Sequence, residues 1–159
     1  ALPHMQLVDS GYKGTIYHTH GSASNDFIKL GGKKMEGAMI VGPLLVVPDD
    51  IPDSLPTKKV TLDFVNGYEK LIGSRPPIFG AGTYDAGLLL TRAIPEAAKK
   101  GKPGTQEFRT ALRDAIASTK DMLASQGVVN ITATDHSGYD HRSRVLITVK
   151  DGKFVLVKD

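Results

Sequence analysis

The chain has 159 residues, which is enough for one domain with a hydrophobic core or for two partial lobes. Its net charge of +3 comes from 20 Lys and Arg against 17 Asp and Glu. The basic residues are scattered rather than gathered in a stripe with aromatic residues, which argues against nucleic-acid binding. The absence of Cys excludes disulfides, thiolate catalysis and zinc–thiolate sites.

The first residues suggest that the sequence is part of a longer protein. It shows neither a signal peptide nor an apolar run long enough to span a membrane. It opens at Ala1 in an amphipathic helical pattern without a start methionine. We therefore expect a piece of a longer chain, whose exposed surfaces would favour association, such as a homodimer of the fragment.

Helix and strand patterns alternate at the beginning of the chain. Helices are predicted over residues 3–10 and 26–30, the second capped by Ser24 or Asn25. Strands are predicted over residues 15–19 and 35–41, the second apolar enough to be buried on both faces of a parallel sheet. This order predicts an α/β fold.

Helical patterns dominate the middle of the chain and strand patterns its end. The segment 42–56 is rich in Pro and Asp and reads as a loop that crosses between two lobes. Three helices are predicted next: residues 58–72, an almost entirely apolar interior helix over about 76–97, and a helix capped by Thr105. Strands are predicted around 129–133, over 143–150 and over 153–157, the last two joined by a hairpin at Asp151-Gly152.

Several catalytic and metal-binding patterns are incomplete. His18 and His20 would point to one face of a strand, and His136 and His141 could join them at a metal, but these two lie in a distant polar turn. The segment 134–140 lacks the alternating ligands and closing Glu of a calcium loop. Ser22 and Ser24 lie near His20 without a nucleophile-elbow motif. We expect no metal, no cofactor and no catalytic residue.

The start of the interior helix is the strongest local candidate for ligand contact. Phe79-Gly80-Ala81-Gly82 places an aromatic ring beside small residues and backbone N–H groups, where the helix dipole favours an acidic group. Asp85 follows one turn later, and we expect it to have a structural role rather than to contact a ligand.

Four stretches together resemble one family. They are residues 11–17 followed by Thr19-His20-Gly21, residues 35–40 followed by Gly42-Pro43, residues 79–86, and the closing hairpin. In this order they are similar to type I periplasmic solute-binding proteins of ABC importers, in the branched-chain amino acid (Leu/Ile/Val-binding) branch and its relatives for aromatic acids. The resemblance covers essentially the whole chain and implies the C-terminal half of a two-lobed α/β protein.

The resemblance implies a division of the chain and a set of ligand-binding residues. Residues 1–48 would form part of the second lobe, 49–126 a crossover and helices packed on the first lobe, and 127–159 strands that return to the second lobe. The implied ligand-binding residues line an interlobe cleft: Thr19, His20, Gly21, Ser22, Phe79 and Gly80. His20 would pair with a ligand carboxylate, or else be an exposed residue at a strand end.

The implied function is ligand binding without catalysis. The chain would belong to a periplasmic receptor that presents a small carboxylate, either a branched-chain amino acid or an aromatic or aliphatic acid, to an ABC permease in the inner membrane. The loop at His20 lacks an acidic residue for an ammonium group, which favours the second class. The alternatives are a sensory regulatory domain of the same fold and an α/β hydrolase using Ser22 or Ser24.

Overall fold

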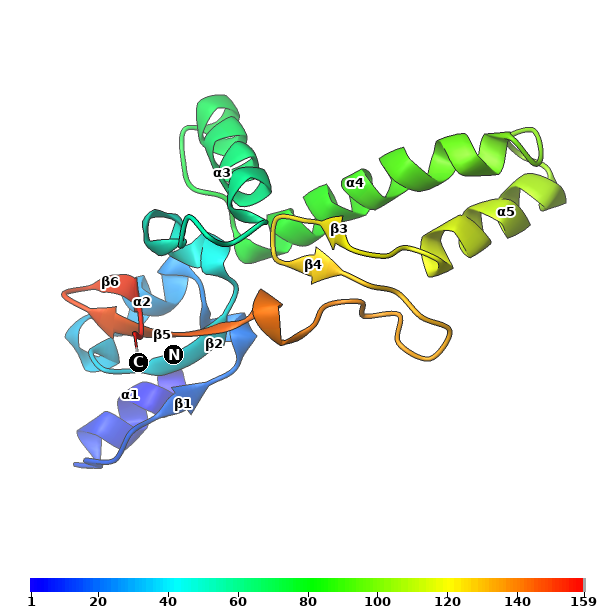
Figure 1. Ribbon diagram of the computed structural model, residues 1–159. Coiled ribbons are helices and arrows are strands. Elements are labelled where there is room, and N and C mark those ends of the chain that lie inside the picture. The colour runs from blue at the N-terminus through cyan, green and yellow to red at the C-terminus, as the bar shows by residue number, and fades with distance from the viewer. Residues whose placement is uncertain (159) are drawn as a thin grey trace.

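A mixed β-sheet with its helices and a long helical arm form the two parts of the computed structural model, which describes residues 1–158 (Figure 1). The helices are α1 (Leu2–Asp9), α2 (Asn25–Gly31), α3 (Lys58–Ile72), α4 (Ile78–Ala98) and α5 (Gln106–Ala117). The strands are β1 (Tyr17–His18), β2 (Met39–Gly42), β3 (Met122–Leu123), β4 (Val128–Val129), β5 (Val145–Lys150) and β6 (Lys153–Leu156). Five short 3₁₀ turns lie between them: η1 (His20–Ser22), η2 (Gly32–Met35), η3 (Leu44–Val46), η4 (Pro48–Asp50) and η5 (His141–Ser143).

The four-stranded sheet has the order β1-β2-β5-β6. Strand β2 pairs in parallel with β1 and antiparallel with β5, so the α/β prediction is confirmed and the sheet is mixed. The predicted strand 35–41 is wrong in two respects. Met35 lies in η2 rather than in the strand, and Val41 is exposed while its neighbour Ile40 is fully buried. One face of this sheet therefore carries the core, as is common where antiparallel pairing occurs.

Local signals place the first two helices as predicted. The Ser24 hydroxyl accepts a hydrogen bond from the backbone N–H of Phe27 (3.3 Å) and caps α2. Gly11, with φ 82°, follows α1 in the left-handed conformation that glycine adopts readily. The hydrophobic core lies between these helices, the sheet, α3 and the first turns of α4. It includes Phe27, Met35, Ile40, Phe64, Val65, Ile78, Ala81, Ile147 and Val149.

The hairpin that closes the sheet forms where the sequence predicts it. Asp151 and Gly152 have φ of 52° and 70°, the combination that a two-residue type I′ turn requires. The Glu36 carboxylate accepts hydrogen bonds from both of their backbone N–H groups, at 2.9 and 2.7 Å. The turn is therefore held against the segment that precedes β2.

Helix α4 is much less buried than the sequence predicts. Figure 1 shows α4 and α5 lying antiparallel as an arm, with the β3–β4 hairpin beside α4. Of the 21 residues of α4, only Ile78, Ala81, Asp85, Ala93 and Ala97 are buried. Phe79, Leu90 and Ile94 are exposed by 73%, 40% and 44%. The prediction of an interior helix is wrong for this structure, because within residues 1–158 its neighbours cover only one side.

Asp85 fastens the arm to the later part of the chain. Its buried carboxylate accepts hydrogen bonds from the backbone N–H groups of Ser125 (2.6 Å) and Gln126 (3.2 Å) and from the Tyr139 hydroxyl (2.7 Å). The predicted structural role of Asp85 is confirmed. Its hydrogen-bond partners lie 40 to 54 residues further along the chain.

Candidate ligand-binding site

The predicted ligand loop lies at the carboxyl edge of the parallel strand pair. Because β1 and β2 run in the same direction, the chain leaves both strands at one edge of the sheet. Strand β1 leads into η1, and β2 leads into Gly42-Pro43 and the crossover segment. In open α/β sheets, ligands bind outside the carboxyl ends of the strands. This geometry makes the edge the first place to look for a site.

The fold brings the two predicted halves of the site together. The rings of His20 in η1 and Phe79 at the start of α4 lie edge to face, with centroids 6.2 Å apart and an interplanar angle of 75°. Both side chains are exposed, as are Thr19 and Gly21, whereas Ser22 is partly buried. An exposed aromatic ring beside an imidazole offers an apolar wall and a polar anchor to a small ligand.

Of the two glycines of the predicted site, only Gly21 leaves open space beside the backbone. A Cβ at Gly21 would have no atom within 4 Å, and its φ is not positive, so the fold itself does not require glycine there. A Cβ at Gly80 would meet Pro77 and Phe64 at ordinary contact distances of 3.6–3.7 Å. Open space beside Gly21 permits a ligand to approach the main chain.

The beginning of α4 contributes a favourable field for an anion. Pro77 precedes the helix without a side-chain cap, and the Gly80 N–H donates to the Pro77 carbonyl at 2.9 Å. The dipole of this helix places partial positive charge at Phe79, which is also the residue in contact with His20. The site thus combines an apolar ring, an imidazole and a helix N-terminus.

His18 does not share a face with His20, contrary to the sequence prediction. His18 turns to the buried His4 of α1, with its Nε2 2.8 Å from His4 Nδ1, and its ring packs against Phe27. Nothing in the sequence singles out His4, whose partner lies 14 positions away. Within the described residues, no group of three or more His, Asp or Glu side chains is arranged to hold a metal ion.

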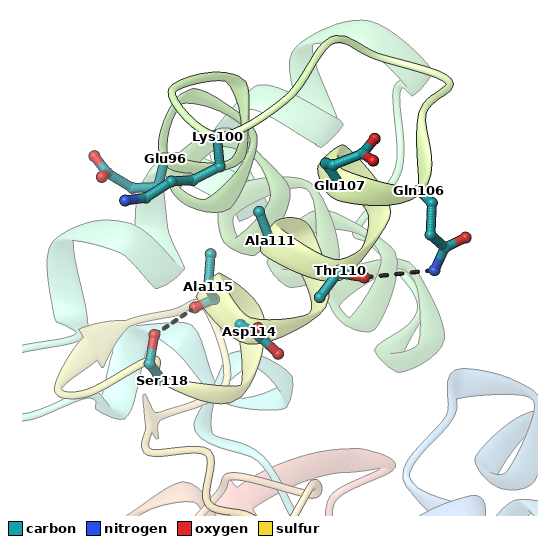
Figure 2. A pocket seen from close by; sticks show the side chains of 9 residues that line it. All are labelled: Glu96, Lys100, Gln106, Glu107, Thr110, Ala111, Asp114, Ala115 and Ser118. Carbon is teal, nitrogen blue, oxygen red and sulfur yellow. Dashed lines mark hydrogen bonds between the residues drawn. The ribbon is translucent and has the colours of Figure 1, made fainter.

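Two other regions lie away from this site. In the segment 134–140, Asp135 accepts hydrogen bonds from the N–H groups of Ser137 and Gly138, so it stabilises a turn. A hollow of about 720 Å³ lies between α4 and α5 (Figure 2). It is lined by Glu96, Lys100, Gln106, Glu107, Thr110, Ala111, Asp114, Ala115 and Ser118. Glu96 is roughly 25 Å along the helix from Phe79, at 1.5 Å per residue.

Comparison with known proteins identifies the family. No protein-family profile and no curated protein sequence match the chain. An extracellular ligand-binding receptor from Rhodopseudomonas palustris is 49% identical, with a TM-score of 0.92, over 99% of this chain and 44% of the receptor. A receptor of the same description from strain HaA2 is 47% identical, with a TM-score of 0.93, over 99% of this chain and 44% of that receptor. The chain belongs to the extracellular ligand-binding receptors of the type I periplasmic binding protein fold.

More distant structures share this receptor fold. A leucine-binding protein from Thermotoga maritima is 24% identical over 99% of this chain and 40% of its own, with a TM-score of 0.75. The predicted family and fold class are therefore confirmed. These relatives are binding receptors rather than enzymes. The chain spans 44% of the length of the two Rhodopseudomonas receptors. Among residues 1–158, no helix is both long enough and apolar enough to cross a membrane.

Proposed function

We propose that this chain is part of an extracytoplasmic solute-binding component of an ABC transporter. In this proposal the receptor holds a small carboxylate in a cleft between two lobes and presents it to a permease in the inner membrane. The observation that carries the proposal is the edge-to-face contact of His20 with Phe79, which joins a loop of the sheet to the start of the helical arm. The similarity to extracellular ligand-binding receptors supports the same role.

The pairing of the strands supports the proposed division into lobes. Strands β1 and β2, from residues 1–48, form one sheet with β5 and β6, from residues 127–159, through the β2–β5 pairing, whereas β4 pairs with β3. We propose that these segments belong to one lobe and that residues 49–126, which include the arm, belong mainly to the other. The exposed face of α4, with Phe79, Leu90 and Ile94, would then be covered by other parts of the receptor.

The loop chemistry favours an acid without an ammonium group. Residues 19–22 offer a hydroxyl, an imidazole, open backbone and a second hydroxyl, but no carboxylate. An ammonium group buried in a cleft requires an anionic or strongly polar partner. We propose an aromatic or aliphatic carboxylate, with Thr19, His20, Gly21 and Ser22 on one wall and Phe79 with Gly80 on the other.

Calorimetry on the complete receptor tests this assignment. With benzoate and leucine as probes, we expect benzoate to bind and Phe79→Ala to weaken its binding at least tenfold, because burial of such a ring contributes about 1.5–3 kcal/mol. Ile94→Ala is the matched control, since it removes an apolar side chain of the same face of α4 about four turns from the site, so it reports any effect of the lobe contact that is not due to the ligand. If the Phe79→Ala and unsubstituted receptors bind benzoate with equal affinity, Phe79 does not line the ligand site. If the receptor binds leucine more tightly than benzoate, the proposed ligand class is wrong.

A further inference from the structure

A stacked pair of histidines lies next to the candidate loop. His4 of α1 is only 3% exposed, and its ring stacks on that of His18 with centroids 5.0 Å apart and an interplanar angle of 28°. Phe27 of α2 packs edge-on against both rings, with its ring centroid 6.1 Å from that of His4 and 4.8 Å from that of His18. The Oγ atom of Ser22, in the predicted ligand loop, lies 3.4 Å from His18 Nδ1. The pair is thus connected directly to the loop.

One backbone carbonyl sets the direction of this hydrogen-bond chain. His4 Nε2 lies 2.8 Å from the Lys34 carbonyl oxygen, which can only accept, so this nitrogen carries a hydrogen. In neutral His4 the Nδ1 atom is then an acceptor, and His18 Nε2 must donate to it across 2.8 Å. Neutral His18 therefore has a bare Nδ1, to which the Ser22 hydroxyl donates. In this state, Ser22 offers only oxygen lone pairs to a ligand.

A single added proton reverses the orientation of Ser22. If His18 takes the proton, its Nδ1 gains a hydrogen while its Nε2 continues to donate to His4. If His4 takes it, His4 Nδ1 becomes the donor, and neutral His18 must carry its hydrogen on Nδ1. In both cases His18 Nδ1 donates to Ser22, and the hydroxyl hydrogen becomes free to point outward. A second proton would set two N–H groups against each other, so the intact pair holds only one.

We propose that His4 and His18 are positioning residues whose shared proton decides whether Ser22 presents an acceptor or a donor to the ligand. This inference rests on the proposed function, in which residues 19–22 line the binding cleft. A carboxylate only accepts hydrogen bonds, so its pairing with Ser22 is favoured once the histidine pair has gained a proton, because the Ser22 hydroxyl then no longer donates to His18. Its negative charge favours the same protonated state. Binding of a carboxylate is therefore coupled to the uptake of one proton.

The surroundings of His18 favour its neutral form in the free protein. Burial lowers the pKa of His18, and the neighbouring His4 lowers it further. The Lys34 ammonium group, on the turn next to His4, is engaged by Asp9 at 2.7 Å. From the other elements, α2 contributes the uncharged Phe27 and β2 places the apolar Ile40 opposite His18. His20 lies in the same loop and faces Phe79. The experiments must therefore distinguish protonation of His20 from protonation of the His4–His18 pair.

Nitrogen NMR of the ligand-free complete receptor tests the proton positions directly. At neutral pH we expect both His4 and His18 to carry their hydrogen on Nε2. On acidification, Nδ1 of His18 should become protonated as the pair takes up one proton. His141, on η5, is the reference for an independent histidine. A neutral His18 with its hydrogen on Nδ1, or uptake of two protons with the pair intact, would overturn the proposal.

Calorimetry of the complete receptor with benzoate tests the coupling. Above the pKa of the free pair, we expect the affinity to fall about tenfold per pH unit, with uptake of one proton seen as a dependence on buffer ionisation enthalpy. Ser22→Ala should abolish this dependence, whereas His20→Asn should retain it. A dependence that disappears with His20→Asn and survives Ser22→Ala would overturn the coupling. Absence of binding of both benzoate and an aliphatic acid, hexanoate, at every pH would refute the carboxylate class and hence the coupling. The NMR spectra test the orientation of Ser22 independently of that outcome.

Discussion

Replacing Asp85 is expected to detach the helical arm from the segment that follows α5. In Asp85→Asn, one side-chain oxygen remains and can still accept from Ser125, while the new amide NH₂ faces donors at Gln126 and Tyr139. Hydrogen bonds to a charged acceptor contribute about 1.5–3 kcal/mol each, and buried donors left unpaired add a desolvation cost. Because Gln126 and Tyr139 are only partly buried, we take the lower end of this range and expect a loss of about 3 kcal/mol in the free energy of unfolding.

Urea unfolding followed by circular dichroism measures this loss. Tyr139→Phe removes only the hydroxyl that donates to Asp85 and should cost about 1.5 kcal/mol. The double variant should then fall short of the sum of the two losses, because both changes remove the same hydrogen bond. Asp63→Asn is the control, because the Asp63 carboxylate forms an exposed ion pair with Lys59. This substitution should lower the free energy of unfolding by less than about 0.5 kcal/mol. A loss below about 1 kcal/mol for Asp85→Asn would show that this carboxylate does not hold the arm.

The remaining predictions concern pH, backbone space and one surface carboxylate. Burial raises the pKa of Tyr139, with further contributions from the hydrogen bond and charge of Asp85. The folded state therefore retains this proton after the unfolded chain loses it near pH 10, and stability should fall by about 1.4 kcal/mol per pH unit above that value, a slope that Tyr139→Phe removes. Gly21→Ala should leave the melting temperature unchanged to within about 2 °C but weaken ligand binding, whereas Gly67→Ala, equally open on α3, should leave binding intact. The Arg142 side chain and backbone N–H lower the pKa of Asp140 to about 2, and Arg142→Ala should raise that pKa in an NMR titration without fully restoring it, because the backbone hydrogen bond remains.

Short-range signals determined several elements completely. Helix α3 occupies residues 58–72 as its apolar spacing predicts. Ser24 and Thr105 cap α2 and α5 because their hydroxyls reach a backbone N–H three residues ahead. The Asp151-Gly152 turn forms because its backbone conformation suits these two residues. Each of these signals lies within a few residues of the structure it produces.

The sequence resemblance also predicted which distant segments form the candidate site. The contact of His20 with Phe79 agrees with the ligand walls that the family motifs implied, and its role in binding stays a prediction. The order of helices and strands predicted α/β architecture, but only pairing across the chain shows that β5 makes the sheet mixed. Strand registers of this kind depend on segments more than a hundred residues apart, which periodicity cannot relate.

The sequence by itself thus determined several of the helices, their caps, the closing turn, and the family to which the chain belongs. Only the tertiary structure decided that Asp85 binds segments near residues 125 and 139, that His4 pairs with His18, and that α4 exposes an apolar face. The physical reason is that hydrogen-bond partners and burial depend on which surfaces the completed fold brings together. A buried His4 and an exposed Phe79 carry no mark of these environments in their neighbouring residues.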